Sequence, residues 1–316
     1  MAGLQGTALS FVGAGSVFLK VKGSATPLRP IGGVSDLKFS LSENKIEQRD
    51  HQNAGGGMRH TLRRPSAVEM DMTMQDFIGA NVALALFGSA TAIAGASVTD
   101  EPVTLYAGGL TPLAKINPSA VSVVSADGTA ASARANSTAY ALDDFYVPAA
   151  ANGHYYKVTV AGTSDSAPPT FPTDGTTVAD GTATVQDMGL ITYPTDGSYY
   201  QVTPGGLWVP DAATFGLISA EQAVDALVDY TYSAQNVVQA LVNAGLEYQM
   251  RFVGLNEAQS GKPVVVDVHR QRFGPTAELA LISDEYGSMT LKADVLKDTS
   301  VIGAGLSQYF EYRYVE

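Results

Sequence analysis

The side chains that most often carry out chemistry are few in this sequence, and their spacing matches no catalytic or metal-binding pattern. Cysteine is absent, which removes thiolate nucleophiles, thiolate metal ligands and disulfide bonds. Four histidines occur far apart and without the H-x-x-x-H spacing of a helical zinc site; they are His51, His60, His154 and His269. Two pairs of adjacent carboxylates, Asp143-Asp144 and Asp284-Glu285, lie in predicted turns, whereas acid–base catalysis needs two groups that face each other across a substrate. The sequence therefore predicts a protein that is not an enzyme and that holds no metal and no cofactor.

Three short motifs begin like functional signatures, and each falls short of its pattern. Residues 13–18 start like a dinucleotide-binding loop but lack its third glycine and a surrounding strand–helix–strand unit. Residues 95–99 lack the final glycine of a nucleophile elbow. Residues 136–138 match a glycosylation acceptor, but the first residues of the chain show no secretory leader. None of the three predicts an activity.

The composition favours strands and turns over long helices. Of the 316 residues, 45% are hydrophobic and 16% are charged, with 32 glycines and 15 prolines, which suits a folded β-rich chain. The net charge of −12 argues against a tight nucleic-acid binder, because such proteins are usually basic. The same charge is compatible with a surface that repels DNA. The uncharged segment 77–98 is interrupted by glycine, serine and threonine, so we expect no membrane span there.

Alternating apolar and polar residues predict strands near both ends of the chain. Segments 246–252 and 264–268 predict a hairpin whose first strand is broken at Gly254-Leu-Asn256. The same alternation occurs in three N-terminal segments, namely 15–22, 36–42 and 68–74. Each of these strands is expected to bury one face and to leave the other in water.

A polar stretch and a short helix complete the N-terminal part. Residues 43–66 show no apolar period and contain three consecutive glycines, so the sequence predicts a long loop. Loops of that length are usually functional or disordered. After it, Phe77–Phe87 predicts a short helix with Asp76 as its N-cap and Gly88 as its stop.

The middle of the chain has a different sequence pattern. Short β segments separated by turn residues begin near residue 100, and residues 153–188 are similar to a small β module that is inserted into phage structural proteins. Phe171 stands where an aromatic platform for a glycan would lie, with no neighbour identifiable from the sequence. Further along, Leu227–Ser233 predicts a strand and Gln235–Asn243 a short helix.

The C-terminal part carries a series of motifs that resembles the second half of phage tail tube proteins. The motifs are Phe252-Val-Gly-Leu-Asn256, Lys262-Pro-Val-Val-Val-Asp267, Phe273-Gly-Pro275, Leu281-Ile-Ser-Asp-Glu285 and Val295-Leu-Lys-Asp298. In the family, strands and turns alternate along these motifs, and an additional apolar strand precedes the Leu281–Glu285 motif. The resemblance implies a mainly β protein with a β-sandwich or barrel fold and a short outer helix. It also implies homohexameric rings that stack into a tube, which conducts genomic DNA into the host during ejection.

The same resemblance implies a domain plan and a contact between rings. The tail tube domain would comprise residues 1–106 and 228–316, interrupted by an inserted β region over 107–227 that includes the 153–188 module. Residues 43–66 stand where the family has a loop that reaches the neighbouring ring. Its candidate contact residues are His51, Arg59, Arg63 and Arg64. The open alternative for this stretch is a solvated mobile loop.

The resemblance further implies a lumen lined by one face of the tube's inner sheet. If segments 36–42, 68–75, 246–252 and 264–270 form one sheet, its polar face would line the bore. Four carboxylates would then make the lumen acidic and leave passing phosphates few fixed partners; they are Glu69, Asp71, Glu247 and Asp267.

The partners and location follow from the family as well. The resemblance implies contacts with further copies of the chain and with tape measure, tail terminator and distal tail proteins, DNA only in transit, and no membrane. It places the protein in the virion tail, in the host cytoplasm during assembly, and favours a siphovirus with a flexible, non-contractile tail. Two alternatives stay open: a virion protein that binds glycans or receptors through the 153–188 module, and a secretion-system tube protein of similar fold.

Overall fold

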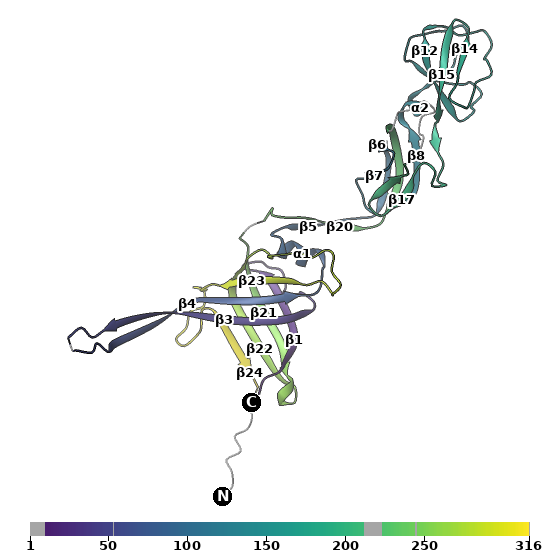
Figure 1. The fold of residues 1–316 in the computed structure, drawn as a ribbon. Coiled ribbons are helices and arrows are strands. Elements are labelled where there is room, and N and C mark those ends of the chain that lie inside the picture. Colours follow the sequence, from purple (N-terminus) through teal and green to yellow (C-terminus); the bar gives the residue numbers. More distant parts are fainter. Residues whose placement is uncertain (1–9, 53, 212–222, 244, 316) are drawn as a thin grey trace. The chain divides into compact units, whose positions relative to one another are not determined.

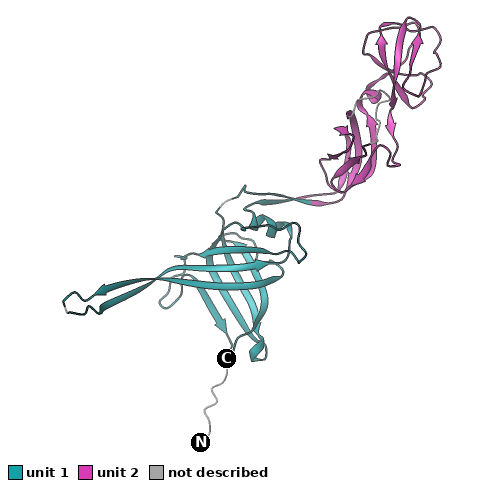
Figure 2. Cartoon of the chain, in the orientation of Figure 1, with its two compact units in different colours: residues 1–91, 236–316 teal, residues 92–235 magenta. Residues whose placement is uncertain are grey.

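The structure is a computed structural model that describes residues 10–52, 54–211, 223–243 and 245–315. The chain is mainly β, as predicted. It forms two compact units, residues 1–91 with 236–316 (unit 1) and residues 92–235 (unit 2), coloured separately in Figure 2. Within the described residues, no helix has the length and apolar character of a membrane span.

The borders of unit 2 lie farther out than the predicted borders after residues 106 and 227. Strands β6 (Ala96–Tyr106) and β19 (Ala223–Tyr232) pair with each other along their length. Because this pairing belongs to unit 2, both strands go with the inserted region. The strand predicted at 227–233 lies within β19, apart from its last residue. At the border itself, β5 (Ser89–Ile93) pairs with β20 (Gln235–Gln239), so the helix predicted over 235–243 is wrong.

One sheet in the order β2-β1-β21-β22-β23-β4-β3, with β24 paired to β22, makes up most of unit 1. Its strands are β1 (Gly13–Val21), β2 (Arg29–Pro30), β3 (Val34–Arg49), β4 (Met58–Met74), β21 (Glu247–Asn256), β22 (Lys262–Phe273), β23 (Met289–Val295) and β24 (Phe310–Tyr314). Strand β22 pairs with β24 through Val264–Val268 and with β23 only through Gln271–Phe273. Because β22 changes its partner strand along its length, the sheet can fold back on itself. Figure 1 shows β3, β4 and β23 crossing β1, β21, β22 and β24 as a second layer.

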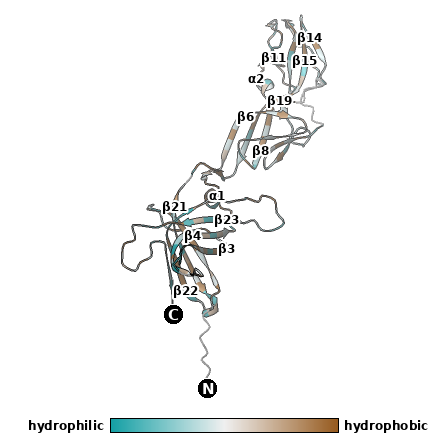
Figure 3. Cartoon of the chain, turned by 60° about the vertical axis from the view of Figure 1, so that its left-hand side comes forward, coloured by the Kyte–Doolittle hydropathy of each residue, from teal (hydrophilic) through white to brown (hydrophobic). Residues whose placement is uncertain are grey.

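The core of unit 1 lies between these two layers. The side chains Met70, Met72 and Met74 of β4 are fully buried and share one apolar cluster with Leu19 of β1 and Val268 of β22. Apolar and polar residues alternate along β4 and β22, as the colours of Figure 3 show. The period-two pattern therefore predicted the buried face of these strands correctly, because burial of one face produces that pattern.

The polar stretch 43–66 is not a loop, which corrects the prediction. Strands β3 and β4 continue through it as a two-stranded ribbon, with Glu43 opposite Pro65 and Gln48 opposite His60. Cross-strand hydrogen bonds hold the ribbon, while nearly every side chain in it is exposed on both faces. A ribbon that buries neither face needs no apolar period, so the usual strand signal is absent from it.

Strand β21 continues through Gly254, where the sequence predicted a break. Gly15 of β1 lies opposite Gly254, and a Cβ atom on either glycine would meet backbone atoms of the other strand within 2.6 Å. The glycines therefore permit close approach of two strands and do not end one. The chain reverses later, at the 3₁₀ turn η1 (Glu257–Gln259) and Ser260, whose φ is 55°.

Helix α1 (Gly79–Ala85) is shorter than predicted, and its N-cap residue is Ile78, without a side-chain cap. The Asp76 carboxylate instead accepts a hydrogen bond from the Gly33 N–H at 3.0 Å. The buried Asn81 side chain donates to the carbonyl oxygens of Asp76 and Ile31 at 2.9 and 2.7 Å. These bonds tie the start of the helix to the β2–β3 connection. The apolar strand predicted before Leu281–Glu285 is also wrong, because this segment lies in the connection between β22 and β23.

Unit 2 contains several smaller sheets and two apolar clusters. The five-stranded sheet comprises β14 (Thr177–Asp180), β15 (Ala183–Leu190), β12 (His154–Val160), β11 (Phe145–Val147) and β9 (Ser132–Ala133). The other elements are β16 (Thr192–Tyr193) and β8 (Pro118–Ser125) beside β19 and β6; β17 (Gln201–Thr203), β18 (Gly206–Val209) and β7 (Gly109–Pro112); β10 (Ala139–Tyr140) and β13 (Gly162–Thr163); and α2 (Ala126–Ala130). A buried ion pair, Arg134 with Asp180 at 2.6 Å, supports the five-stranded part, and the Tyr146 hydroxyl donates to the same carboxylate at 2.9 Å.

Candidate functional site

The histidines and carboxylates do not converge on one place. Among the residues that the structure describes, no three histidine, aspartate or glutamate side chains are grouped as metal ligands would be. His51 and His60 lie at the far end of the β3–β4 ribbon, and His269 lies on β22. In unit 2, Nδ1 of His154 lies 2.9 Å from Oδ1 of the buried Asp187. The four histidines are therefore spread over separate places in the fold.

The four carboxylates predicted to line a lumen fall into two pairs on the two layers of unit 1. Glu69 and Asp71 alternate with buried methionines of β4, so they point away from the core. Glu247 lies on β21 and Asp267 on β22, in the other layer. Since the two layers enclose the core between them, the pairs lie on opposite outer faces, and the fold does not bring all four together.

The outer face that carries Asp267 is close to neutral. Arg251 donates to both carboxylate oxygens of Asp267, at 2.5 and 3.0 Å, and Arg313 pairs with the same group. Burial alone would raise the pKa of Asp267, but the hydrogen bond from Arg251 and the two arginine charges hold it below its ordinary value. Glu247 is likewise paired, because Arg270 donates to its two oxygens at 2.7 and 2.5 Å, which lowers its pKa.

The outer face of β3, β4 and β23 is more acidic. Its carboxylates outnumber its two lysines; they are Asp36, Glu69, Asp71 and Asp294 against Lys38 and Lys292. In the strand register, Asp71 lies between Lys38 and Lys292, yet the Lys38 amine pairs with Asp36 at 2.5 Å. Exposed pairs of this kind contribute little stability, so this face keeps a net negative charge.

The β3–β4 ribbon beyond the body of unit 1, residues 43–64, is called the arm here. Pairing of β4 with β23 ends at Glu69, and beyond it β3 and β4 pair only with each other among the described residues. Figure 1 shows the arm extending past the other strands of unit 1. Seven residues per strand at about 3.3 Å each give it a reach of about 20 Å.

The arm differs from the rest of the chain in charge and carries exposed apolar groups. Five basic residues stand against three carboxylates: Lys45, Arg49, Arg59, Arg63 and Arg64 against Glu43, Glu47 and Asp50. The whole chain carries −12, so the remainder is strongly acidic. Ile46 and Leu62 lie opposite each other in the ribbon, and about half of each side chain is exposed. Arg63 pairs with Glu43 at 2.6 Å. Arg59 and Arg64, which are also predicted to contact a neighbouring ring, lie on the same ribbon.

Several strand edges of unit 1 have no partner strand among the described residues. Strand β3 ends the sheet order, and β24 pairs only with β22. The edge of β1 is free over Gly13–Ser16, because β2 pairs with Phe18 and Leu19 and the Ile31 N–H donates to the Val17 carbonyl. Free edges expose backbone N–H and C=O groups that another chain can pair with.

Phe171, considered from the sequence as an aromatic platform, has aromatic neighbours in unit 2. Its ring packs 4.8 Å from the ring of Tyr156 and 6.0 Å from that of Tyr146, measured between centroids. Both tyrosines are fully buried, and Phe171 belongs to their apolar cluster. The aromatic side chain therefore contributes to the apolar core of the module.

The comparisons with known proteins assign a family without a function. The fold and surfaces define a mainly β protein with unpaired edges and a protruding arm. The chain belongs to the family described as "Protein of unknown function UCP028589", which matches residues 10–163 and 159–313. No curated protein matches the chain.

Proposed function

We propose that this protein is a structural subunit of a bacteriophage tail tube, which assembles into stacked homohexameric rings around a lumen that conducts DNA. The observation that carries the proposal is the arm. An ordered ribbon that buries neither face within its own chain gains little by folding alone, since a lone hairpin is marginally stable in water. Binding to a second copy would bury Ile46 and Leu62 and would thereby stabilise the folded ribbon.

Charge supports this partner for the arm. The arm is net positive and the rest of the chain strongly negative, so the arm of one subunit and the body of the next attract each other. Complementary charge of this kind steers association and suppresses wrong pairings. The free edges of β1, β3 and β24 offer a second kind of contact, in which neighbours within a ring complete each other's sheets. Contacts between different surfaces close into a ring when the rotation allows it.

The acidic outer face of β3, β4 and β23 is the better candidate for the lumen. Its carboxylates outnumber its lysines, whereas Asp267 on the opposite face is neutralised by Arg251 and Arg313. Repeated around a ring, the β4 face would repel phosphates and let DNA pass without adhering. Of the four predicted lumen residues, the proposal therefore keeps Glu69 and Asp71.

Electron microscopy of the purified full chain tests the proposal. Rings or tubes of uniform diameter are the expected result, alone or after addition of tail initiator proteins. A chain that stays monomeric at high concentration with those partners present would overturn it. The glycan-binding alternative gains no support from Phe171, which is packed in an apolar cluster.

A further inference from the structure

One loop of unit 1 exposes large apolar side chains to solvent. Leu281, Ile282 and Tyr286 are 85%, 98% and 99% exposed. They flank the carboxylates Asp284 and Glu285, which have no ion-pair partner among the described residues. Residues 281–286 are called the tip loop here.

The tip loop is presented by an ordered base. The Thr276 N–H donates to the Ala85 carbonyl at 2.8 Å, and the Gly274 N–H donates to the Lys292 carbonyl at 2.8 Å. Within the tip, the Ser283 hydroxyl accepts from the Glu285 N–H at 3.0 Å, as in a local turn. Three large, exposed apolar side chains on one anchored turn are an interaction surface more often than a solvated one.

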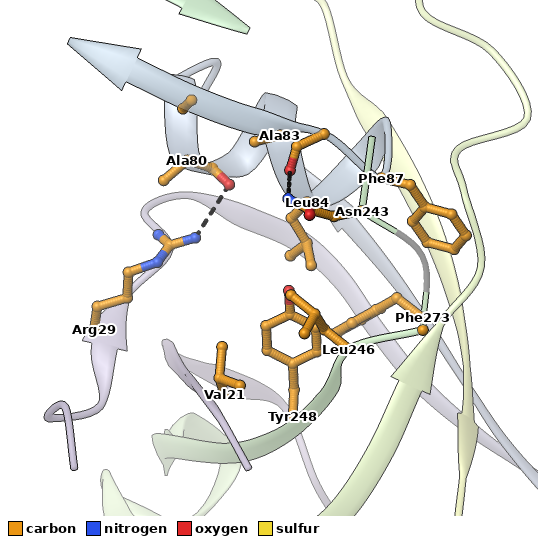
Figure 4. Close-up of a pocket in the computed structure, with 13 residues that line it drawn as sticks. Val21, Arg29, Ala80, Ala83, Leu84, Phe87, Asn243, Leu246, Tyr248 and Phe273 are labelled. Atoms are coloured by element: carbon orange, nitrogen blue, oxygen red, sulfur yellow. Dashed lines mark hydrogen bonds between the residues drawn. The ribbon is translucent and has the colours of Figure 1, made fainter. Parts of the chain in front are cut away.

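A pocket in the same unit has the complementary chemistry (Figure 4). It has a volume of about 280 Å³, and its apolar wall includes Val21, Leu84, Phe87, Leu246, Tyr248 and Phe273. Arg29 lies at one side of it, as Figure 4 shows. This volume is at the low end for small-molecule sites, and the apolar wall suits aliphatic side chains.

Arg29 is a cation without an acidic partner. Its guanidinium donates to the Asn81 side-chain oxygen at 3.0 Å and to the Ala80 and Pro30 carbonyls at 3.4 Å. No carboxylate pairs with it among the described residues. Burial lowers the pKa of this guanidinium, although an arginine stays charged at any physiological pH. A half-buried cation of this kind favours a carboxylate ligand.

We propose that the tip loop of one subunit inserts Leu281 and Ile282 into the Arg29 pocket of the next subunit, where Asp284 and Glu285 pair with Arg29. The inference rests on the proposed ring and names one of its contacts. Tip and pocket are different surfaces, so the contact is head-to-tail and propagates around a ring. Of the pockets in unit 1, this one combines an apolar wall with an unpaired cation, whereas the pocket beside Arg251 and Arg313 already contains Asp267 and Glu311.

Single cysteines on two separate chains test the contact, because the natural chain has no thiol. Ser283→Cys places a thiol in the tip loop, and Ala80→Cys places one at the pocket wall. An oxidised mixture of the two variants should give at least tenfold more disulfide-linked dimer than Ser283→Cys mixed with Ala150→Cys, an exposed position in unit 2. Arg29→Glu in the Ala80→Cys chain should abolish the excess. Asp284→Arg with Glu285→Arg in the Ser283→Cys chain should then restore it.

The outcomes separate this contact from the tube itself. Rings in the electron microscope without an excess of cross-linked dimer would overturn the contact and leave the tube proposal standing. Cross-linking without rings would support the contact and overturn the tube, and the loss of both would overturn both. A disulfide within one monomer that carries both cysteines would show that the tip occupies its own pocket, which also overturns the contact.

Discussion

The ring of Phe39 stacks on the ring of Phe310, with centroids 5.2 Å apart and an angle of 19° between the planes. Phe39 belongs to β3 and Phe310 to β24, two strands that are not hydrogen-bonded to each other. The stack therefore joins two edges of the curled sheet through side chains alone. Phe39 precedes the arm on strand β3, so the stack adds a contact that holds this strand before the arm begins.

Replacing Phe39 with alanine should lower the free energy of unfolding by about 2 kcal/mol. Truncation of a buried phenylalanine typically costs about 3–5 kcal/mol, and Phe39 is only half-buried. Leu41→Ala is the matched control, because this residue lies two positions along the same strand and is 66% exposed. Its effect should stay within about 0.5 kcal/mol. Denaturant titration of both variants measures the difference, and equal effects would show that the stack does not hold β3.

The arm variant Ile46→Thr with Leu62→Thr should block tube formation and leave folding nearly unchanged. Both side chains are largely exposed in the single chain, so their loss costs little stability there, and threonine keeps the β propensity. A contact between subunits would lose its apolar centre. The control Leu110→Thr removes an apolar group of similar exposure from β7 of unit 2. Tubes of normal length from the arm variant would exclude the arm as an assembly contact.

The sequence predicted those strands whose burial leaves a period-two pattern. Met70, Met72 and Met74 are an example, since each contacts the core while its neighbours remain in water. The arm left no such pattern because it buries nothing in its own chain, and its strands were predicted as a loop. The helix prediction for segment 235–243 was wrong for a related reason. Strand β20 pairs only with β5, and this partner lies far away in the sequence.

The candidate surfaces were predicted only in part. The contact role of Arg59, Arg63 and Arg64 stays a prediction, which came from the family's loop position and a cluster of basic residues in an acidic chain. The sequence did not predict that Glu69 and Asp71 lie apart from Glu247 and Asp267. An alternating pattern shows which side chains of a strand share a face, but it does not show how the sheet folds back on itself. The Arg29 pocket draws residues from β1, β2, α1 and β21, and no local pattern in the sequence indicates such a convergence.

Asp298 should make the stability of unit 1 depend on pH at the acid end. Burial alone would raise its pKa, but hydrogen bonds from Lys22 and Ser300 lower it to about 2, from about 3.9 in an unfolded chain. Because the folded pKa is the lower one, the stabilisation is fully present above pH 4 and is lost as the pH falls from 4 to 2. The difference corresponds to roughly 2–3 kcal/mol. Unfolding titrations between pH 2 and 6 should show a smaller slope in this range for Asp298→Asn, and an unchanged slope would contradict the assignment.

A charge change on the β4 face should slow DNA ejection while tubes still assemble. The suitable variant is Glu69→Lys with Asp71→Asn, because Asp71 lies between Lys38 and Lys292 in the register and a third lysine there would add repulsion. The variant face would be net positive, so phosphates would find partners in the bore, and ejection should slow more at low salt than at high salt. The control Glu311→Lys reverses a charge on β24, in the opposite layer, and should leave the ejection rate unchanged. If the control slows ejection and the β4 variant does not, the lumen lies on the other face and the predicted role passes to Glu247 and Asp267.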